Sequence, residues 1–335
     1  MMKTPAAADN HRSKVRNLTI IVLLTGLAIL IGSCASRLDY RQVAILHPAE
    51  QPWPDSSFAY FEGVTIHYRQ AIPAGEPKGY VLLLHGLAGS SWSWQTLMPA
   101  LQAAGYQVLA LDIPPFGFSS NDFGAFKDAG TAAAVLKELL TSIHDGQWIL
   151  GGHSMGGRYV AELSLRYPDF ARALLLFDGA VLAQRDDNGN SSALNGFFGP
   201  LVRAYVRDTL SRPRRLASVL KSAYDQKPSE EAVLAYAAPF SQPGKIDALL
   251  QWAAAPGAAS VLELTELKLP VLLLWGRKDT WVPLESAYTI KESVPQASLV
   301  IIDDAAHNPM ETHPDQTIAA VLAFLEGLAP GAQER

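Results

Sequence analysis

The sequence contains one cysteine, Cys34, among its 335 residues. A single cysteine excludes an internal disulfide, so the folded chain depends on its hydrophobic core. The length suits one large domain of roughly 250–300 residues with additional segments, which is ample for such a core. The sequence also lacks low-complexity tracts and internal repeats, and its composition is ordinary for a globular enzyme.

The sequence also has no excess of basic over acidic residues. The formal net charge is −5, and a chain beginning at Cys34 carries −8 because the residues before it carry +3. An acidic body without a basic stripe argues against nucleic acid as a partner.

Patterns for metal ions and phosphate groups are absent from the sequence. There is no His-x-x-x-His, no cysteine pair and no carboxylate cluster at ligand spacing. The pair Gly151-Gly152 is not part of a Gly-x-Gly-x-x-Gly motif. We therefore expect the protein to use no cofactor.

The apolar run near the N-terminus, Leu18 to Gly32, follows a basic region that ends at Arg16. At 1.5 Å per residue the run spans somewhat over ~20 Å, short of the ~30 Å hydrocarbon core of a membrane. A basic flank and a short apolar core are typical of an export signal. The ending Ile31-Gly32-Ser33-Cys34 resembles the lipobox of bacterial lipoproteins, whose cysteine is acylated and becomes the first mature residue.

This resemblance implies a signal peptide over residues 1–33, a lipid on Cys34 and membrane attachment in the cell envelope, facing the periplasm or exterior. Ala35 resembles the outer-membrane sorting pattern of Gram-negative bacteria. The alternative is an uncleaved anchor helix with an incidental cysteine, which places the protein at the inner membrane. Residues 34–57, which are rich in proline and polar groups, are expected to form a linker.

Continuous apolar runs alternate with helix-compatible segments beyond residue 58, as in strands covered on both faces. The expected strands are 80–84, 107–111, 148–150, 173–177, 271–275 and 298–302, preceded by a hairpin over 58–61 and 64–68. The expected helices are 91–104, 129–143, 154–167, one from about 284, and 314–328. The alternation predicts an α/β fold with a mostly parallel sheet and helices on both faces.

The alternation breaks over residues 184–260, which lack strand-like runs and carry scattered aromatic side chains. We expect a helical insertion here, between core segments 58–183 and 261–328. Five arginines make it locally basic: Arg203, Arg207, Arg212, Arg214 and Arg215. Such side chains either solvate helix surfaces or attract an anionic substrate.

An expected strand leads directly into Gly152-His153-Ser154-Met155-Gly156. A serine raised above a sheet needs a sharp strand-to-helix turn, and glycines two residues before and after it allow the backbone to crowd there. Its hydroxyl then lies at a helix N-terminus, where free N–H groups favour developing negative charge. The motif predicts a nucleophilic serine.

Polar residues past the ends of the expected strands include Ser154, Asp279 and His307, at the edge where open α/β sheets keep their sites. Their order along the chain is that of the α/β-hydrolase triad. From about residue 58 to 328 the chain resembles the α/β-hydrolase superfamily, specifically the group with a helical cap after the sixth core strand. The matching pieces are Leu84–Ser90, Leu111–Ser119, Gly152–Gly157, Trp275–Asp279 and Ala306-His307.

The resemblance implies that Ser154 attacks an acyl carbon, that His307 is the base and that Asp279 orients His307. The backbone N–H groups of Leu87 and Met155 are expected to form the oxyanion hole. Asp178, just past the sixth strand, is the alternative acid. The rivals Asp303 and Asp304 are expected in a turn and His313 near the final helix, while His85 and His153 are expected to brace the oxyanion loop and the serine turn.

The most specific function that follows is hydrolysis of a small or medium carboxylic ester through an acyl-enzyme. The alternatives are a C–C bond hydrolase of the ring-cleavage-product type, and an acyltransferase or amidase that uses the same triad. A lipoprotein that kept the fold as a binding module is the remaining alternative. The cap sets the acyl-binding region, and its aromatic content does not separate these activities.

Overall fold

The computed structural model describes residues 52–61, 63–182, 194–196, 198–255 and 261–328. The predicted signal or anchor segment, with Cys34, and most of the predicted linker lie outside these ranges. Within them, none of the helices is both long and apolar enough to cross a membrane.

Eight strands form one sheet in the order β1-β2-β4-β3-β5-β6-β7-β8. They are β1 (Ser56–Phe61), β2 (Val64–Ala71), β3 (Gly79–Leu84), β4 (Tyr106–Leu111), β5 (Trp148–His153), β6 (Ala171–Phe177), β7 (Val271–Gly276) and β8 (Ser298–Ile302). The β1-β2 and β2-β4 pairs are antiparallel and the other five pairs are parallel. The mostly parallel sheet predicted from the sequence is confirmed.

The first strand begins at Ser56, inside the expected linker, because Ser56 and Ser57 pair with Arg69 and Tyr68 of β2. Every residue of β5 and β7 is buried, which matches their continuous apolar sequences. The sheet therefore needs helices on both faces.

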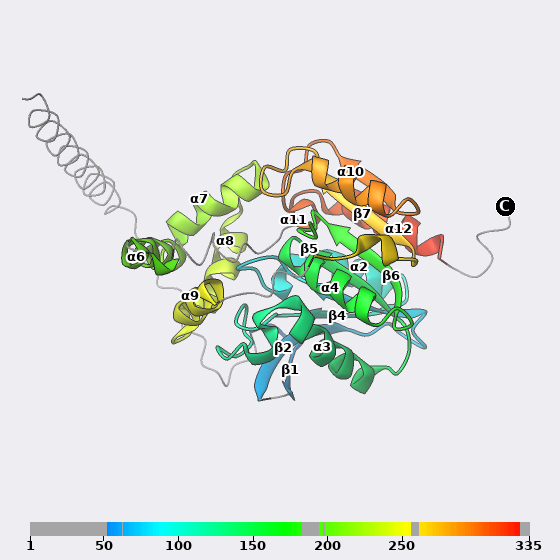
Figure 1. Ribbon diagram of the computed structural model, residues 1–335, viewed down its shortest axis with the longest axis horizontal. Helices are drawn as coiled ribbons and strands as arrows, with labels where there is room; N and C mark the ends of the chain where they lie inside the picture. The colour runs from blue at the N-terminus through cyan, green and yellow to red at the C-terminus, as the bar shows by residue number, and fades with distance from the viewer. Residues whose placement is uncertain (1–51, 62, 183–193, 197, 256–260, 329–335) are drawn as a thin grey trace, which may run out of the picture. The chain divides into compact units, whose positions relative to one another are not determined.

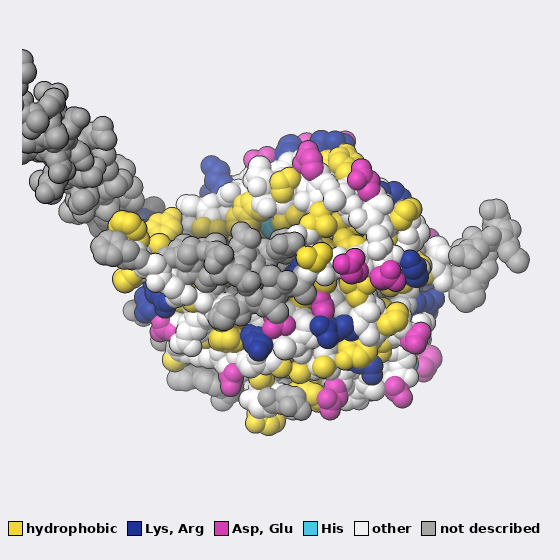
Figure 2. All heavy atoms as spheres, viewed as in Figure 1, with side chains coloured by type: hydrophobic (Ala, Val, Ile, Leu, Met, Phe, Trp, Pro, Cys, Tyr) yellow, Lys and Arg dark blue, Asp and Glu magenta, His cyan; other side chains and the backbone are white. Residues whose placement is uncertain are grey.

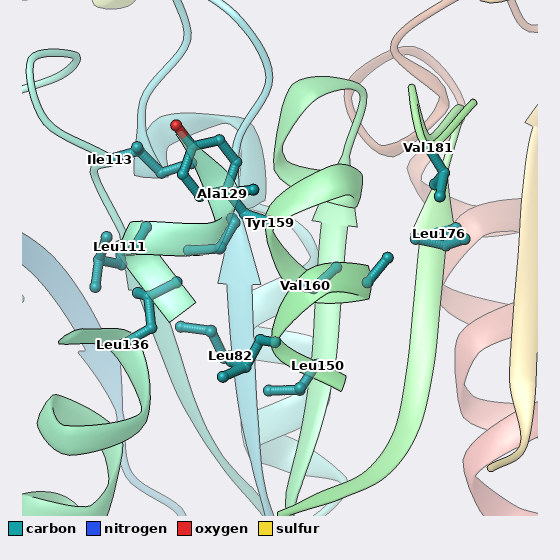
Figure 3. Close-up of a cluster of buried hydrophobic side chains, with 14 of the residues drawn as sticks. Leu82, Leu111, Ile113, Ala129, Leu136, Leu150, Tyr159, Val160, Leu176 and Val181 are labelled. Atoms are coloured by element: carbon teal, nitrogen blue, oxygen red, sulfur yellow. The ribbon is translucent and has the colours of Figure 1, made fainter. Parts of the chain in front are cut away.

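Alternate side chains of the central strands enter two cores, one on each face of the sheet. Leu82 and Leu84 of β3 belong to the first core, and Val81 and Leu83 belong to the second. Figure 3 shows Leu82 and Leu150 of the sheet beside side chains from the helices of the first core.

The helices of the α/β core flank the sheet (Figure 1). They are α2 (Leu97–Ala103), α3 (Ala129–Ile143), α4 (Met155–Arg166), α10 (Leu284–Ser293), α11 (Pro309–Thr312) and α12 (Pro314–Glu326). The single helix expected over 91–104 is instead a 3-10 turn, η1 (Ser91–Trp94), followed by α2. The ring of Pro99 clashes with a helical carbonyl four residues earlier, so α2 cannot extend back through Gln95.

Helices make up most of the described residues between β6 and β7, where a helical cap was expected. The helices are α6 (Gly199–Leu210), α7 (Pro213–Tyr224), α8 (Glu230–Ala237) and α9 (Lys245–Ala254). Figure 1 shows them grouped on one side of the molecule. On the face in Figure 2, acidic and basic side chains of the described residues are interspersed and form no continuous basic stripe.

Candidate active site

Ser154 occupies the turn between β5 and α4, with φ 48° and ψ −116°. This left-handed conformation is costly for a residue with a Cβ and persists only where the surroundings fix it. Two hydrogen bonds fix it here: the N–H of Ser154 donates to the carbonyl of Phe177 at 3.0 Å, and its carbonyl accepts from Ala180 at 2.9 Å. The side chain does not cap α4, so its hydroxyl remains available for chemistry.

The glycines around Ser154 are required by close backbone packing. A Cβ on Gly152 would overlap the carbonyl of Gly156, and a Cβ on Gly156 would overlap the carbonyl of Leu84. The predicted reason for the Gly-x-Ser-x-Gly pattern is therefore visible in the packing of the turn.

The expected oxyanion donors lie in two segments that approach each other at Ser154. Met155 is the first residue of α4, where an N–H has no partner within its own helix. Leu87 follows Gly86, whose added Cβ would lie 2.7 Å from Nδ1 of His153 and 3.2 Å from the Cβ of Ser154. Only glycine lets the loop that carries Leu87 approach the serine this closely.

His307 and Asp279 form a buried pair. The Nδ1–H of His307 donates to Oδ2 of Asp279 at 2.7 Å. The other oxygen, Oδ1, accepts the N–H groups of Trp281 at 2.7 Å and Val282 at 3.0 Å. Asp279 thus receives three donors, and hydrogen bonds of this kind favour the charged form of a carboxyl group. With the proton on Nδ1, His307 carries its free lone pair on Nε2.

The structure also places His307 beside the serine turn. The Nε2–H of His153, the neighbour of Ser154, donates to the carbonyl of His307 at 2.7 Å. The two imidazole centroids lie 4.7 Å apart. The indole of Trp281 stacks on His307 at 5.3 Å with an interplanar angle of 25°. His307 and Asp279 therefore lie beside the turn that carries Ser154.

Residues 79–314 match the family model described as the alpha/beta hydrolase fold. The chain belongs to the α/β-hydrolase family. Among its relatives, the uncharacterized hydrolase YugF of Bacillus subtilis is 24% identical over 268 residues, which cover 79% of this chain and 96% of YugF. Pimeloyl-[acyl-carrier protein] methyl ester esterase of Aeromonas hydrophila is 27% identical over 248 residues, which cover 73% and 94%.

A solved structure described as a membrane phospholipase A is similar to this α/β hydrolase with a TM-score of 0.66. The two share 24% identity, and the match covers 95% of this chain and 99% of the other. This likeness confirms the fold, and family membership supports an enzyme of the hydrolase class.

Two further histidines of this α/β hydrolase hold its loops. His85 accepts the N–H of Ile113 on Nε2 at 2.9 Å, so its Nδ1–H donates to the carbonyl of Gly86 at 2.7 Å. Burial lowers the pKa of His85, and burial together with the charge of His307 lowers the pKa of His153 well below its usual value. Both side chains are neutral donors, which fits the predicted bracing role.

The rival acids lie in different surroundings. Asp178 is fully buried and accepts the N–H of Gly276 at 2.9 Å, but His307 donates to Asp279. Asp303 and Asp304 are exposed and pair with Arg277 and Lys278.

The rival histidine, His313, has Nδ1 2.9 Å from the hydroxyl of Thr312, at the start of α12. It therefore lies beside the final helix, as expected from the sequence.

Asp178, Asp279 and His307 are the described residues whose ligand atoms lie close enough together to hold a metal ion, within 4.8 Å. Oδ2 of Asp279 and Nδ1 of His307 are already bonded to each other. These two atoms therefore share a proton with each other.

A cluster that joins the cap to the core was not expected from the sequence. The carboxylate of Glu311 accepts the hydroxyl of Tyr236 at 2.6 Å, the amide of Asn308 at 3.0 Å and the hydroxyl of Tyr224. Ser93 of η1 lies 3.1 Å from the same Tyr236 oxygen. The only signal in the sequence was the place of Asn308 directly after His307 and of Glu311 four residues after it.

A second Ser-His-Asp arrangement lies at the antiparallel side of the sheet. His67 contacts Oγ of Ser56 at 2.8 Å through Nε2 and Oδ2 of Asp112 at 2.7 Å through Nδ1. Ser56 is 5% exposed and the other two side chains are fully buried. Without access for a substrate, this arrangement joins β1, β2 and the end of β4.

Proposed function

We propose that this α/β hydrolase cleaves small or medium carboxylic esters through an acyl-enzyme on Ser154, with His307 as base and Asp279 as orienting acid. The observation that carries the proposal is the 2.7 Å bond from His307 Nδ1 to Asp279 Oδ2, beside the strained turn that presents Ser154. The bond fixes the tautomer in which Nε2 can accept a proton.

The reaction follows from these roles. His307 takes the proton of the Ser154 hydroxyl as Oγ attacks the ester carbonyl, and it then gives that proton to the departing alcohol. Water attacks the acyl-enzyme with the same assistance, and the carboxylic acid leaves. The N–H groups of Leu87 and Met155 stabilise the oxyanion of both tetrahedral intermediates, and losing one such donor typically costs ~10²–10³ in rate.

Relatives support an ester as the substrate. The Aeromonas hydrophila relative is named a methyl ester esterase, and a Psychrobacter immobilis relative, 27% identical over 267 residues, is named a lipase. A carboxylic ester is the substrate type that these two names share.

We further propose that the protein acts at the cell envelope, attached to a membrane through a lipid on Cys34 or through the apolar segment Leu18 to Gly32. The lipobox-like sequence before Cys34 supports the lipid. Mass analysis of the mature N-terminus distinguishes the two: a chain beginning with a lipid-modified Cys34 establishes the lipoprotein, and a chain beginning at Met1 establishes the anchor.

The hydrolase proposal is tested with a fluorophosphonate probe on the full chain. We expect labelling of the wild type and of the control Ser142→Ala, whose hydroxyl bonds the carbonyl of Leu139 in α3, and none of Ser154→Ala. The absence of wild-type labelling would support the binding-module alternative.

A series of p-nitrophenyl esters of increasing acyl length then measures the substrate range. We expect activity on short and medium chains that disappears in Ser154→Ala. Labelling by the probe together with no hydrolysis of any ester would favour amide or C–C bond cleavage.

A further inference from the structure

Asp178 is a buried carboxyl group that the proposed mechanism does not use. It follows β6 directly and has φ 46°, a left-handed conformation that aspartate and asparagine tolerate better than most residues. Its N–H donates to the carbonyl of Leu274 at 3.0 Å, and its Oδ1 accepts from Gly276 at 2.9 Å. Both ends of the residue are thus fixed to β7.

The two acids at this edge differ in the donors that they receive. Asp279 accepts from Trp281, Val282 and His307. Asp178 accepts one backbone N–H on Oδ1, and no described residue donates to Oδ2. Oxygen atoms of both acids and a nitrogen of His307 lie within 4.8 Å of one another. Two carboxyl groups this close in a buried site do not both ionise.

We propose that Asp178 is a positioning residue, held as a neutral carboxylic acid whose Oδ2–H donates to the Asp279 carboxylate and thereby sets the basicity of His307. The proton resides on the carboxyl group with fewer donors, and it gives Oδ2 the partner that it otherwise lacks. Burial, followed by the charge of Asp279, raises the pKa of Asp178 well above its usual value. The kinetic consequence rests on the proposed function, because it concerns the base of that reaction.

The hydrogen bond from Asp178 changes the proton affinity of His307 in one direction. A hydrogen bond from Asp178 draws negative charge of Asp279 away from the imidazolium, so it weakens the stabilisation of the charged form of His307. Asp279 and His153 contact His307, His85 acts on His153, and Glu311 is bonded to Asn308, the residue after His307. These four groups stay unchanged when Asp178 alone is replaced.

The kinetic test is the acid limb of the pH profile of kcat/KM, measured on a soluble ester with the full chain. Asp178→Ala removes the donor, and we expect the limb to move up by roughly half to one pH unit. In Asp178→Asn the side-chain amide donates to Asp279 and its oxygen still accepts from Gly276, so the limb returns to the wild-type position. Asp304→Asn, which removes an exposed carboxylate, is the matched control.

Two results of the pH profile would overturn the proposal. An ionised Asp178 would stabilise the imidazolium of His307, so a limb that moves down in both Asp178 variants overturns the proposal. An unmoved limb in Asp178→Ala makes the residue merely structural and also overturns it.

A second measurement needs neither activity nor the alanine variant. The infrared difference spectrum of wild type minus Asp178→Asn at neutral pH should contain the carbonyl stretch of a protonated carboxylic acid. Its absence overturns the neutral acid whether or not the protein hydrolyses esters. If the wild type shows this band but hydrolyses no ester, the proposed function is rejected and the neutral Asp178 is kept.

Discussion

The N–H of His307 donates to the carbonyl of Ala223 across 2.9 Å. Ala223 belongs to the last turn of α7, and His307 belongs to the loop between β8 and α11. The cap is therefore bonded directly to the backbone of the proposed base. The Glu311 cluster, which includes Tyr224, reinforces this junction one residue farther along α7.

Asp279→Asn tests the orienting acid. An amide that donates to Nδ1 of His307 favours the tautomer with the proton on Nε2, which cannot accept the serine proton. We expect kcat to fall by roughly 10³–10⁴-fold on a soluble ester. Asp303→Asn, in the exposed pair with Arg277, is the control and should keep wild-type kcat. A loss below about tenfold in Asp279→Asn would contradict the role, since removing a triad acid costs far more.

Gly86→Ala tests the approach of the oxyanion loop to the serine. The added methyl would lie 2.7 Å from His153 Nδ1, so the loop that carries Leu87 must move away. We expect kcat/KM to fall by about 10²–10³-fold, the loss typical of one oxyanion donor. Gly79→Ala, whose methyl meets the Tyr106 ring at an ordinary 3.4 Å, is the control. Equal kcat/KM values for the two variants would rule out this role of Gly86.

Asp112→Asn tests the second Ser-His-Asp arrangement as a stabilising network. Burial alone raises the pKa of Asp112, but the charge and hydrogen bond of His67 and the Phe118 N–H outweigh burial and lower it to about 2. Because this pKa lies below its unfolded value, the contribution to stability is present above about pH 4 and is lost as the pH falls towards 2.

Urea unfolding measured across that pH range checks the prediction. We expect the wild type to lose on the order of 2 kcal/mol of unfolding free energy through this group. Asp112→Asn should be less stable at pH 7 and should lack that part of the acid loss, whereas exposed Asp304→Asn should follow the wild type. Identical acid profiles for Asp112→Asn and the wild type would refute the coupling to His67.

Glu311→Gln tests the cluster between cap and core. Burial raises the pKa of Glu311, although the hydroxyls of Tyr224 and Tyr236 oppose the rise. The folded state then binds the proton more tightly than the unfolded state, so the unfolding free energy falls as the pH rises above about 4.5. We expect Glu311→Gln to remove that fall between pH 4 and 8.

Thermal or urea unfolding at several pH values measures the difference. Glu231→Gln, in the first turn of α8 and exposed, is the matched control and should keep the wild-type slope. A wild-type slope in Glu311→Gln would mean that the carboxyl group has the same proton affinity in the folded and unfolded states.

Sequence patterns alone predicted the order of strands and helices, because buried parallel strands need continuous apolar runs and the segments between them are helix-compatible. They also predicted where the serine lies, since a Gly-x-Ser-x-Gly motif after an apolar run favours a sharp turn from a strand into a helix. The start of α2 differed from expectation because Pro99 limits a helix that the apolar pattern alone would extend.

Which acid bonds to His307 depends on how the folded chain brings distant loops together. Asp178 and Asp279 both follow buried strands, and the sequence does not show that His307 reaches Oδ2 of Asp279. The Glu311 cluster and the His67 network were likewise hidden, because each joins side chains from segments far apart in the chain. A hydrogen bond depends on angstrom-scale distances, whereas a sequence pattern specifies only the element and the face that a residue occupies.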